Sequence, residues 1–128
     1  MPVHDAAAGP QRLRLLLTPD VDAPAAARRA LRALPLGAAH DDVLLLTSEL
    51  VSNAVVHAGL HAGQPIELDV ECADAGDRIR VRVRDHGRGF APGVPGDGHG
   101  LRMIAAVTPN WGVEQDGGTC VWFELAAT

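Results

Sequence analysis

The sequence predicts an α+β fold, a two-layer sandwich in which helices cover one face of a mostly antiparallel, mixed sheet. Three stretches have helical periodicity and five have strand-like alternation, and four of the strands fall into adjacent pairs. The predicted order is strand, helix, helix, two strands, loop, helix, two strands. Adjacent strands joined by short turns give antiparallel neighbours, and amphipathic helices need a sheet face to cover.

Alternation and end signals predict the first three elements. Leucines alternate with arginine over residues 13–17, which predicts a strand. Asp22 and Pro24 form a start signal for a helix over about residues 23–34. A second helix should run over about residues 41–58, and because it is apolar almost all round we expect it to be buried.

Two alternating runs in the middle of the chain predict an antiparallel hairpin. Residues 66–72 place apolar side chains at one parity and acids at the other, while residues 78–85 alternate apolar side chains with arginines. The acidic row of one strand should face the basic row of the other, which favours cross-strand pairing. These arginines are therefore interpreted as a solvated sheet face and not as a nucleic-acid patch.

The last third of the chain completes the predicted sheet. Residues 86–100 are rich in glycine and proline and predict a loop. A short helix is expected over about residues 101–107. A final hairpin should comprise residues 111–115 and 119–125, with its turn at residues 116–118.

Glu49 and Asn53 lie one turn apart on the second predicted helix and therefore share a face. On a helical wheel they stand beside Leu45, Leu46 and Val56, a setting that is costly for polar groups without partners. One explanation of the two side chains is structural, as a hydrogen-bonded pair or a polar stripe on the surface. Alternatively, they have a chemical function. In the chemical interpretation, a carboxylate base stands beside an oxygen ligand for a hard cation such as Mg²⁺.

Asp85 continues the core-facing row of its strand, because it shares parity with the apolar residues of the run 78–85. Its carboxylate should point beneath the sheet towards the helices, where a ligand that donates hydrogen bonds would satisfy it. Gly87 and Gly89 follow and would let a flat group approach the backbone closely. An ordinary Asp-Gly turn is the alternative.

Three further features support a ligand more weakly. Residues 96–101, Gly-Asp-Gly-His-Gly-Leu, lead into a helix, where exposed backbone N–H groups favour phosphate, although most glycine loops are only loops. Thr119 shares parity with the inward residues of the last strand, and local hydrogen bonding would explain it equally well. His57, one turn beyond Asn53, is interpreted as a cap or rim residue.

Together these motifs resemble the GHKL superfamily of ATP-binding domains, the Bergerat fold, and within it the bacterial anti-sigma-factor serine kinases and histidine-kinase-like ATPases. The resemblance covers about residues 12–125. Residues 49–57 resemble the N box of that family, residues 85–89 its G1 box, residues 98–101 its G2 box and residues 117–125 its closing hairpin.

The resemblance implies ATP and Mg²⁺ as cofactors and a role for each site residue. Asn53 would hold Mg²⁺, Asp85 would accept from the adenine amine with help from Thr119, and Glu49 would be the general base that activates a serine or threonine hydroxyl. The remaining ATP-binding residues implied by the boxes are His57, Gly87, Gly89, Gly98, His99, Gly100 and Leu101. Phosphoryl transfer then depends on positioning and charge stabilisation.

The resemblance also implies partners. A sigma factor, an anti-sigma antagonist protein, or both would bind this chain, and a homodimer is expected through the first strand and helix. Between Phe90 and Gly98 the sequence has no basic residue, which departs from the family. This departure favours an alternative, a non-catalytic nucleotide-gated module that binds protein.

Whole-chain properties limit the remaining function classes. A net charge of −5 disfavours nucleic-acid binding, which needs a basic footprint. With neither a secretory signal nor a long apolar run, the sequence predicts no membrane segment and a cytoplasmic location. We expect residues 1–11 to be a flexible N-terminus and residues 12–125 to be one GHKL-type ATP-binding domain. Since no phosphoacceptor helix precedes residue 12, a histidine kinase catalytic domain is not expected.

Overall fold

The computed structural model describes residues 11–57, 64–73, 77–86, 97–115 and 117–128. Five strands form one sheet in the order β1-β2-β3-β5-β4. They are β1 (Gln11–Leu17), β2 (Ile66–Cys72), β3 (Arg78–Asp85), β4 (Trp111–Gln115) and β5 (Thr119–Ala126). All four pairings are antiparallel, so the predicted α+β class and antiparallel sheet are confirmed; no parallel pair accompanies them among the described strands.

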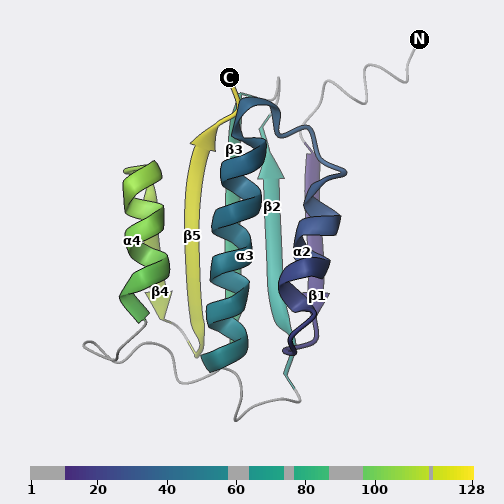
Figure 1. Cartoon of the computed structure of the whole chain (residues 1–128), viewed down its shortest axis with the longest axis vertical. Helices are drawn as coiled ribbons and strands as arrows, with labels where there is room; N and C mark the ends of the chain where they lie inside the picture. The colour runs from purple at the N-terminus through teal and green to yellow at the C-terminus, as the bar shows by residue number, and fades with distance from the viewer. Residues whose placement is uncertain (1–10, 58–63, 74–76, 87–96, 116) are drawn as a thin grey trace.

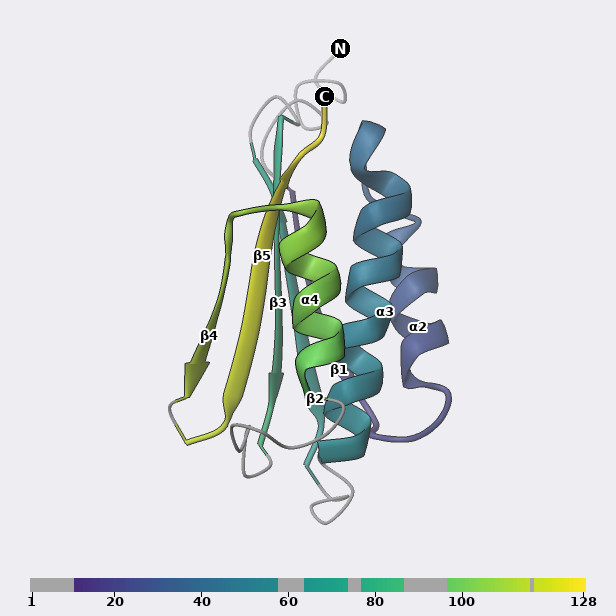
Figure 2. The same ribbon diagram turned by 60° about the vertical axis from the view of Figure 1, so that its left-hand side comes forward.

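The helices lie in a layer on one face of this sheet, as Figures 1 and 2 show. They are α2 (Ala23–Leu31), α3 (His40–His57) and α4 (Asp97–Val107), and the short 3₁₀ helix η1 (Gly37–Ala39) leads into α3. In the layer, α3 lies between α2 and α4. Among the described residues, no helix combines the length and the apolar character that crossing a bilayer requires.

Two helix ends differ from the prediction. α2 ends at Leu31, three residues early, because from Ala33 on the amides bond three residues back, Ala33 to Ala30 at 3.2 Å and Leu34 to Leu31 at 3.0 Å. α4 begins at Asp97, so the glycines assigned to a loop form its first turn. The first amides of a helix have no intrahelical partner in any case, and glycine therefore disturbs that turn little.

The core lies between the inner sheet face and the helices, and the strand alternation builds it. Side chains at one parity of β2 and β3 are buried, and the other parity is partly or fully exposed. The largest fully buried side chains include Phe123, Leu31, Leu36, Leu46, Ile66, Leu68, Ile79 and Ile104. The predicted parity of the central hairpin is confirmed.

The expectation that α3 is buried all round is wrong. Leu45 is 48% exposed and Val56 is 75% exposed. The helix covers the sheet with one face and packs against α2 and α4 with its flanks, so a fourth face is left without a neighbour in the described part of the chain.

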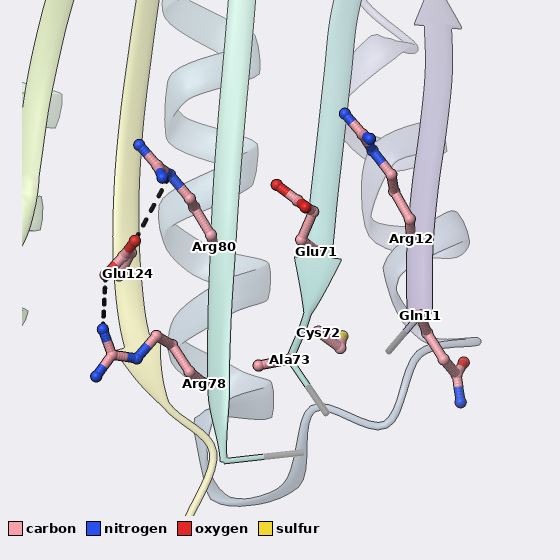
Figure 3. Close-up of a pocket in the computed structure, with 8 residues that line it drawn as sticks. All are labelled: Gln11, Arg12, Glu71, Cys72, Ala73, Arg78, Arg80 and Glu124. Carbon is pink, nitrogen blue, oxygen red and sulfur yellow. Dashed lines mark hydrogen bonds and ion pairs between the residues drawn. The ribbon is translucent and has the colours of Figure 1, made fainter. Parts of the chain in front are cut away.

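The acidic row of β2 and the basic row of β3 lie opposite each other as predicted, but the arginine ion pairs among the described residues join these strands to β1 and β5. Glu67 is registered with Arg84, Asp69 with Arg82, and Glu71 with Arg80. On the far side of β3, Glu124 lies 3.3 Å from Arg78 and 3.6 Å from Arg80, and Figure 3 shows both contacts. Because positive and negative columns alternate across the strands, the interpretation as a solvated face is supported.

Arg12 of β1 donates two hydrogen bonds to Asp69, from Nε at 3.0 Å and from Nη2 at 2.7 Å. These bonds hold the pKa of the Asp69 carboxyl below its ordinary value of 3.8. A carboxyl whose pKa is lower in the folded than in the unfolded state adds stability above the unfolded pKa. That stability is lost as the pH falls through the folded pKa.

We therefore expect Arg12→Ala to lower stability at neutral pH and to flatten its decline below about pH 4. Urea midpoints measured stepwise from neutral to acid pH check this. Arg14→Ala is the matched control, since its Nε lies 3.7 Å from the same carboxylate and makes no hydrogen bond to it. If the urea midpoint of Arg12→Ala falls with acid pH as steeply as that of the wild type, Arg12 is not the cause of the lowered Asp69 pKa.

Candidate nucleotide site

Four elements bring their ends together at one end of the sandwich. β3 ends there at Asp85 and β5 begins there at Thr119, while α3 ends and α4 begins on the helical side. Figure 1 shows this end at the bottom of the molecule, and Figure 2 shows α3 and α4 side by side in front of the sheet. The sequence motifs far apart in the chain are therefore brought to one place by the antiparallel topology.

Asp85 is the buried acid of this site. It is 5% exposed at the end of the inward row of β3, as its parity predicted. Its register partner is Thr119, which is 1% exposed. The Thr119 hydroxyl has no hydrogen-bond partner among the described residues, and a buried hydroxyl in that state is costly without a ligand or water. A buried carboxylate beside a buried hydroxyl can receive a polar edge of a flat group.

The open face of α3 carries the second pair. Glu49 and Asn53 are both partly exposed and lie one turn apart, so the structure does not place them in a closed apolar environment. Of the three predicted neighbours only Leu46 is buried, while Leu45 and Val56 are open. Glu49 and Asn53 therefore lie on an accessible face of α3 and not in the core, so their carboxylate and amide oxygen can reach a ligand.

The first turn of α4 holds the predicted G2 residues. The backbone of Gly98, His99 and Gly100 lies in that turn, where the first amides have no partner within the helix, and the side chain of His99 is outside the described part. Leu101 is half-buried and packs against the core. A helix start with unused N–H groups is suited to phosphate.

Four predicted residues cannot be placed fully. Gly87 and Gly89 lie outside the described residues, and only the backbone is described of His57, at the end of α3, and of His99, at the start of α4. Sequence reasoning also missed one contact, from His86 Nε2 to Glu67 Oε2 at 2.9 Å. The signal was available, because the two residues stand diagonally across the predicted hairpin with outward parity.

The donor set fits a magnesium ion bound mainly by phosphate. Among the described residues, no group of three or more His, Cys, Asp or Glu side chains could enclose a metal. Mg²⁺ commonly keeps several waters and takes one or two protein oxygens together with substrate phosphates. The accessible Asn53 amide oxygen is such a ligand, so the residues present fit a phosphate-bound ion and do not form a closed metal site.

Gly118 lets the chain that enters β5 lie close beside the end of β3, its neighbour in the sheet. A Cβ at this position would overlap the backbone oxygen of Asp85, an atom that cannot move aside as a flexible side chain would. We expect Gly118→Ala to destabilise the fold by about 1–3 kcal/mol and to weaken nucleotide binding, because it displaces Asp85 from Thr119. Urea unfolding and calorimetric titration measure the two effects.

The neighbouring Gly117→Asn is the control for that substitution. Gly117 has a φ of 71°, which asparagine tolerates, and a Cβ there meets no atom within 4 Å. We expect its stability and nucleotide affinity to stay near those of the wild type. Equal losses in both variants would show that the turn as a whole, and not the contact with Asp85, is responsible.

Comparisons with known proteins agree with this geometry. The profile of a family described as "Histidine kinase-like ATPase domain" matches residues 17–125, most of the chain. Among solved structures, the RsbU and RsbW domains of Rv1364c from Mycobacterium tuberculosis match with a TM-score of 0.69 and 22% identity. That match covers 89% of this chain and 32% of the other, and at this identity it shows a shared fold. No curated protein sequence matches the chain.

Proposed function

Because this chain belongs to the histidine kinase-like ATPase domain family, the group within the GHKL superfamily that its motifs resemble, we propose that it is an ATP-binding regulatory protein. More specifically, we propose an anti-sigma factor that phosphorylates a serine or threonine of an anti-sigma antagonist. The observation that carries the proposal is the meeting of the buried Asp85–Thr119 pair with the Glu49–Asn53 face at one end of the sandwich.

In the proposed complex the adenine lies against the end of the sheet. Asp85 accepts a hydrogen bond from the exocyclic amine, and the buried Thr119 hydroxyl, directly or through water, satisfies a second polar atom of the ring. By the family resemblance, Gly87 and Gly89, which lie outside the described residues, would line the same pocket. The phosphates would be cradled by the backbone around Gly98, Gly100 and Leu101 at the start of α4, where the first amides are not used within the helix, and the family resemblance adds His57 and His99 to the ATP-binding residues.

Asn53 would hold the Mg²⁺ that offsets charge on the phosphates, and the ion would polarise the transferred phosphoryl group. Glu49, one turn earlier on the same accessible face, would take the proton of an incoming hydroxyl. A hydroxyl carried by a partner protein can reach this face because Leu45 and Val56 beside it are exposed. Glu49 is thus proposed as the catalytic base.

The proposed partners follow from the same assignment. They are a sigma factor, an antagonist protein, or both, bound in the cytoplasm; neither nucleic acid nor a membrane is a partner. A homodimer would form through β1 and α2. In support, β1 is an edge strand with Leu16 68% exposed, and a groove of about 450 Å³ between β1 and α2 is lined largely by leucines and alanines.

The kinase proposal is tested by incubating the wild-type chain with Mg-ATP and a panel of anti-sigma antagonist proteins. We expect phosphate on a serine or threonine of one antagonist, detected by mass spectrometry. A wild type that binds ATP and transfers phosphate to no antagonist would contradict kinase activity while leaving nucleotide binding intact.

One observation favours a second function, a non-catalytic nucleotide-gated binding module. Residues 91–97 contain no arginine or lysine to stabilise charge on the transferred phosphoryl group. Here ATP would set the shape of a surface that captures a partner. Partner binding that is unchanged in Glu49→Ala and lost in Asp85→Asn, without phosphate transfer, would support this function over the first.

A further inference from the structure

The backbone at Asp85 is held firmly on one side by β5. Asp85 is registered with Thr119, and Gly118 brings the β5 backbone into direct contact with the Asp85 carbonyl. The direction of the Asp85 carboxylate depends on the backbone of residues 85 and 86, since a side chain of only two χ angles cannot compensate for a rotated strand end.

On the other side of β3 the backbone pairing stops one residue short. The described register between β2 and β3 ends at Glu67 and Arg84, one residue before Asp85. Beyond that point the described residues contain one link, the part-buried contact of 2.9 Å between His86 Nε2 and Glu67 Oε2. Glu67 makes this diagonal contact although Arg84 is its direct register partner.

The chemistry of the contact fixes its polarity. An ionised carboxylate can only accept, so Nε2 of His86 carries the hydrogen and donates it to Glu67. The bond is therefore charge-assisted. It links residue 86 to β2 just beyond the point where the registered backbone pairing of the two strands ends.

We propose that His86 is a positioning residue for adenine recognition. Through its hydrogen bond to Glu67 it fixes the end of β3, and thereby the carboxylate of Asp85, for the exocyclic amine of the base. His86 acts through Asp85 and need not touch the nucleotide. This inference rests on the proposed binding of adenine at Asp85 and extends it to the preference for the amine.

The test is calorimetric titration of ATP and of inosine triphosphate, which has a carbonyl in place of the amine. For His86→Ala and Glu67→Ala we expect ATP affinity to fall about five- to tenfold, the size of one ordinary hydrogen bond, because the Asp85 acceptor is displaced and not removed. Inosine triphosphate affinity should change little. His86→Gln keeps a donor at a similar reach and should restore most of the ATP preference. The double variant should lose no more than either single variant.

Glu71→Ala is the matched control, because Glu71 lies on the same strand and the same outer face and has no hydrogen bond in the described part of the chain. Thermal unfolding without nucleotide shows whether each variant folds. If His86→Ala does not fold, the titrations of Glu67→Ala test the positioning role instead.

Two outcomes separate this inference from the proposed function. A wild type that binds neither nucleotide overturns both. If the wild type prefers ATP and His86→Ala keeps that preference, the positioning role alone is overturned. The same holds if His86→Ala loses affinity for both nucleotides equally. Failure of His86→Gln to restore the preference would also overturn it.

Discussion

Replacing Glu49 by alanine is expected to lower the rate of phosphate transfer to the antagonist by about 10²- to 10⁴-fold, the usual contribution of a general base. ATP affinity should change little, because the carboxylate is assigned to the incoming hydroxyl and not to the nucleotide. Glu49 lies on the accessible face of α3 and is not part of the buried core, so the variant should fold. Single-turnover transfer under saturating ATP measures the effect on chemistry directly.

Two companion variants sharpen the result. Glu49→Gln keeps the shape and removes the base, and it should be as inactive as Glu49→Ala. Asp42→Ala removes an exposed acid from the first turn of the same helix and should leave transfer unchanged. Full transfer by Glu49→Gln would show that no proton is taken by this side chain.

The second large effect is expected at Asp85. In Asp85→Asn the charged acceptor becomes a neutral amide that turns either an oxygen or an NH₂ group to the adenine amine. We expect ATP affinity to fall by about 10- to 100-fold, the range for a hydrogen bond to a charged group in a buried site. Calorimetric titration with ATP measures it.

Asp77→Asn is the control, at the residue that precedes the opposite end of β3. Asp77 is exposed and contributes its backbone carbonyl to Ala127, so its side chain can change without loss of that bond. Its ATP affinity should equal that of the wild type. Wild-type ATP affinity in Asp85→Asn would contradict the placing of adenine at the end of β3.

The strands and the inward acid could be predicted because a strand has a strict period of two. Once Ile79, Val81 and Val83 are assigned to the core, Asp85 must follow them inward, and the structure confirms this. The same reasoning predicted an inward Thr119 in the last hairpin. Its complete burial without a partner among the described residues could not be predicted, because that depends on how closely β5 and β3 pack.

The helices were harder to predict, because the sequence does not show which helix faces have neighbours. A wheel placed Glu49 and Asn53 among Leu45 and Val56 and suggested burial, whereas α2 and α4 cover only the flanks of α3. The start of α4 was missed because glycine signals a loop unless it falls in the unbonded first turn. The family resemblance, in contrast, was predicted from ordered motifs and is confirmed over residues 17–125.

Binding of ATP to the folded chain is the central claim, and the midpoint of thermal unfolding at increasing ATP concentration tests it most directly. A ligand that binds only the folded state adds about 2.7 kcal/mol of stability at a hundred times its dissociation constant, which would raise the midpoint by roughly 10 °C. We predict a rise in the wild type that grows with the logarithm of ATP concentration and is largely lost in Asp85→Asn. A wild-type midpoint that stays constant at all ATP concentrations would contradict the claim.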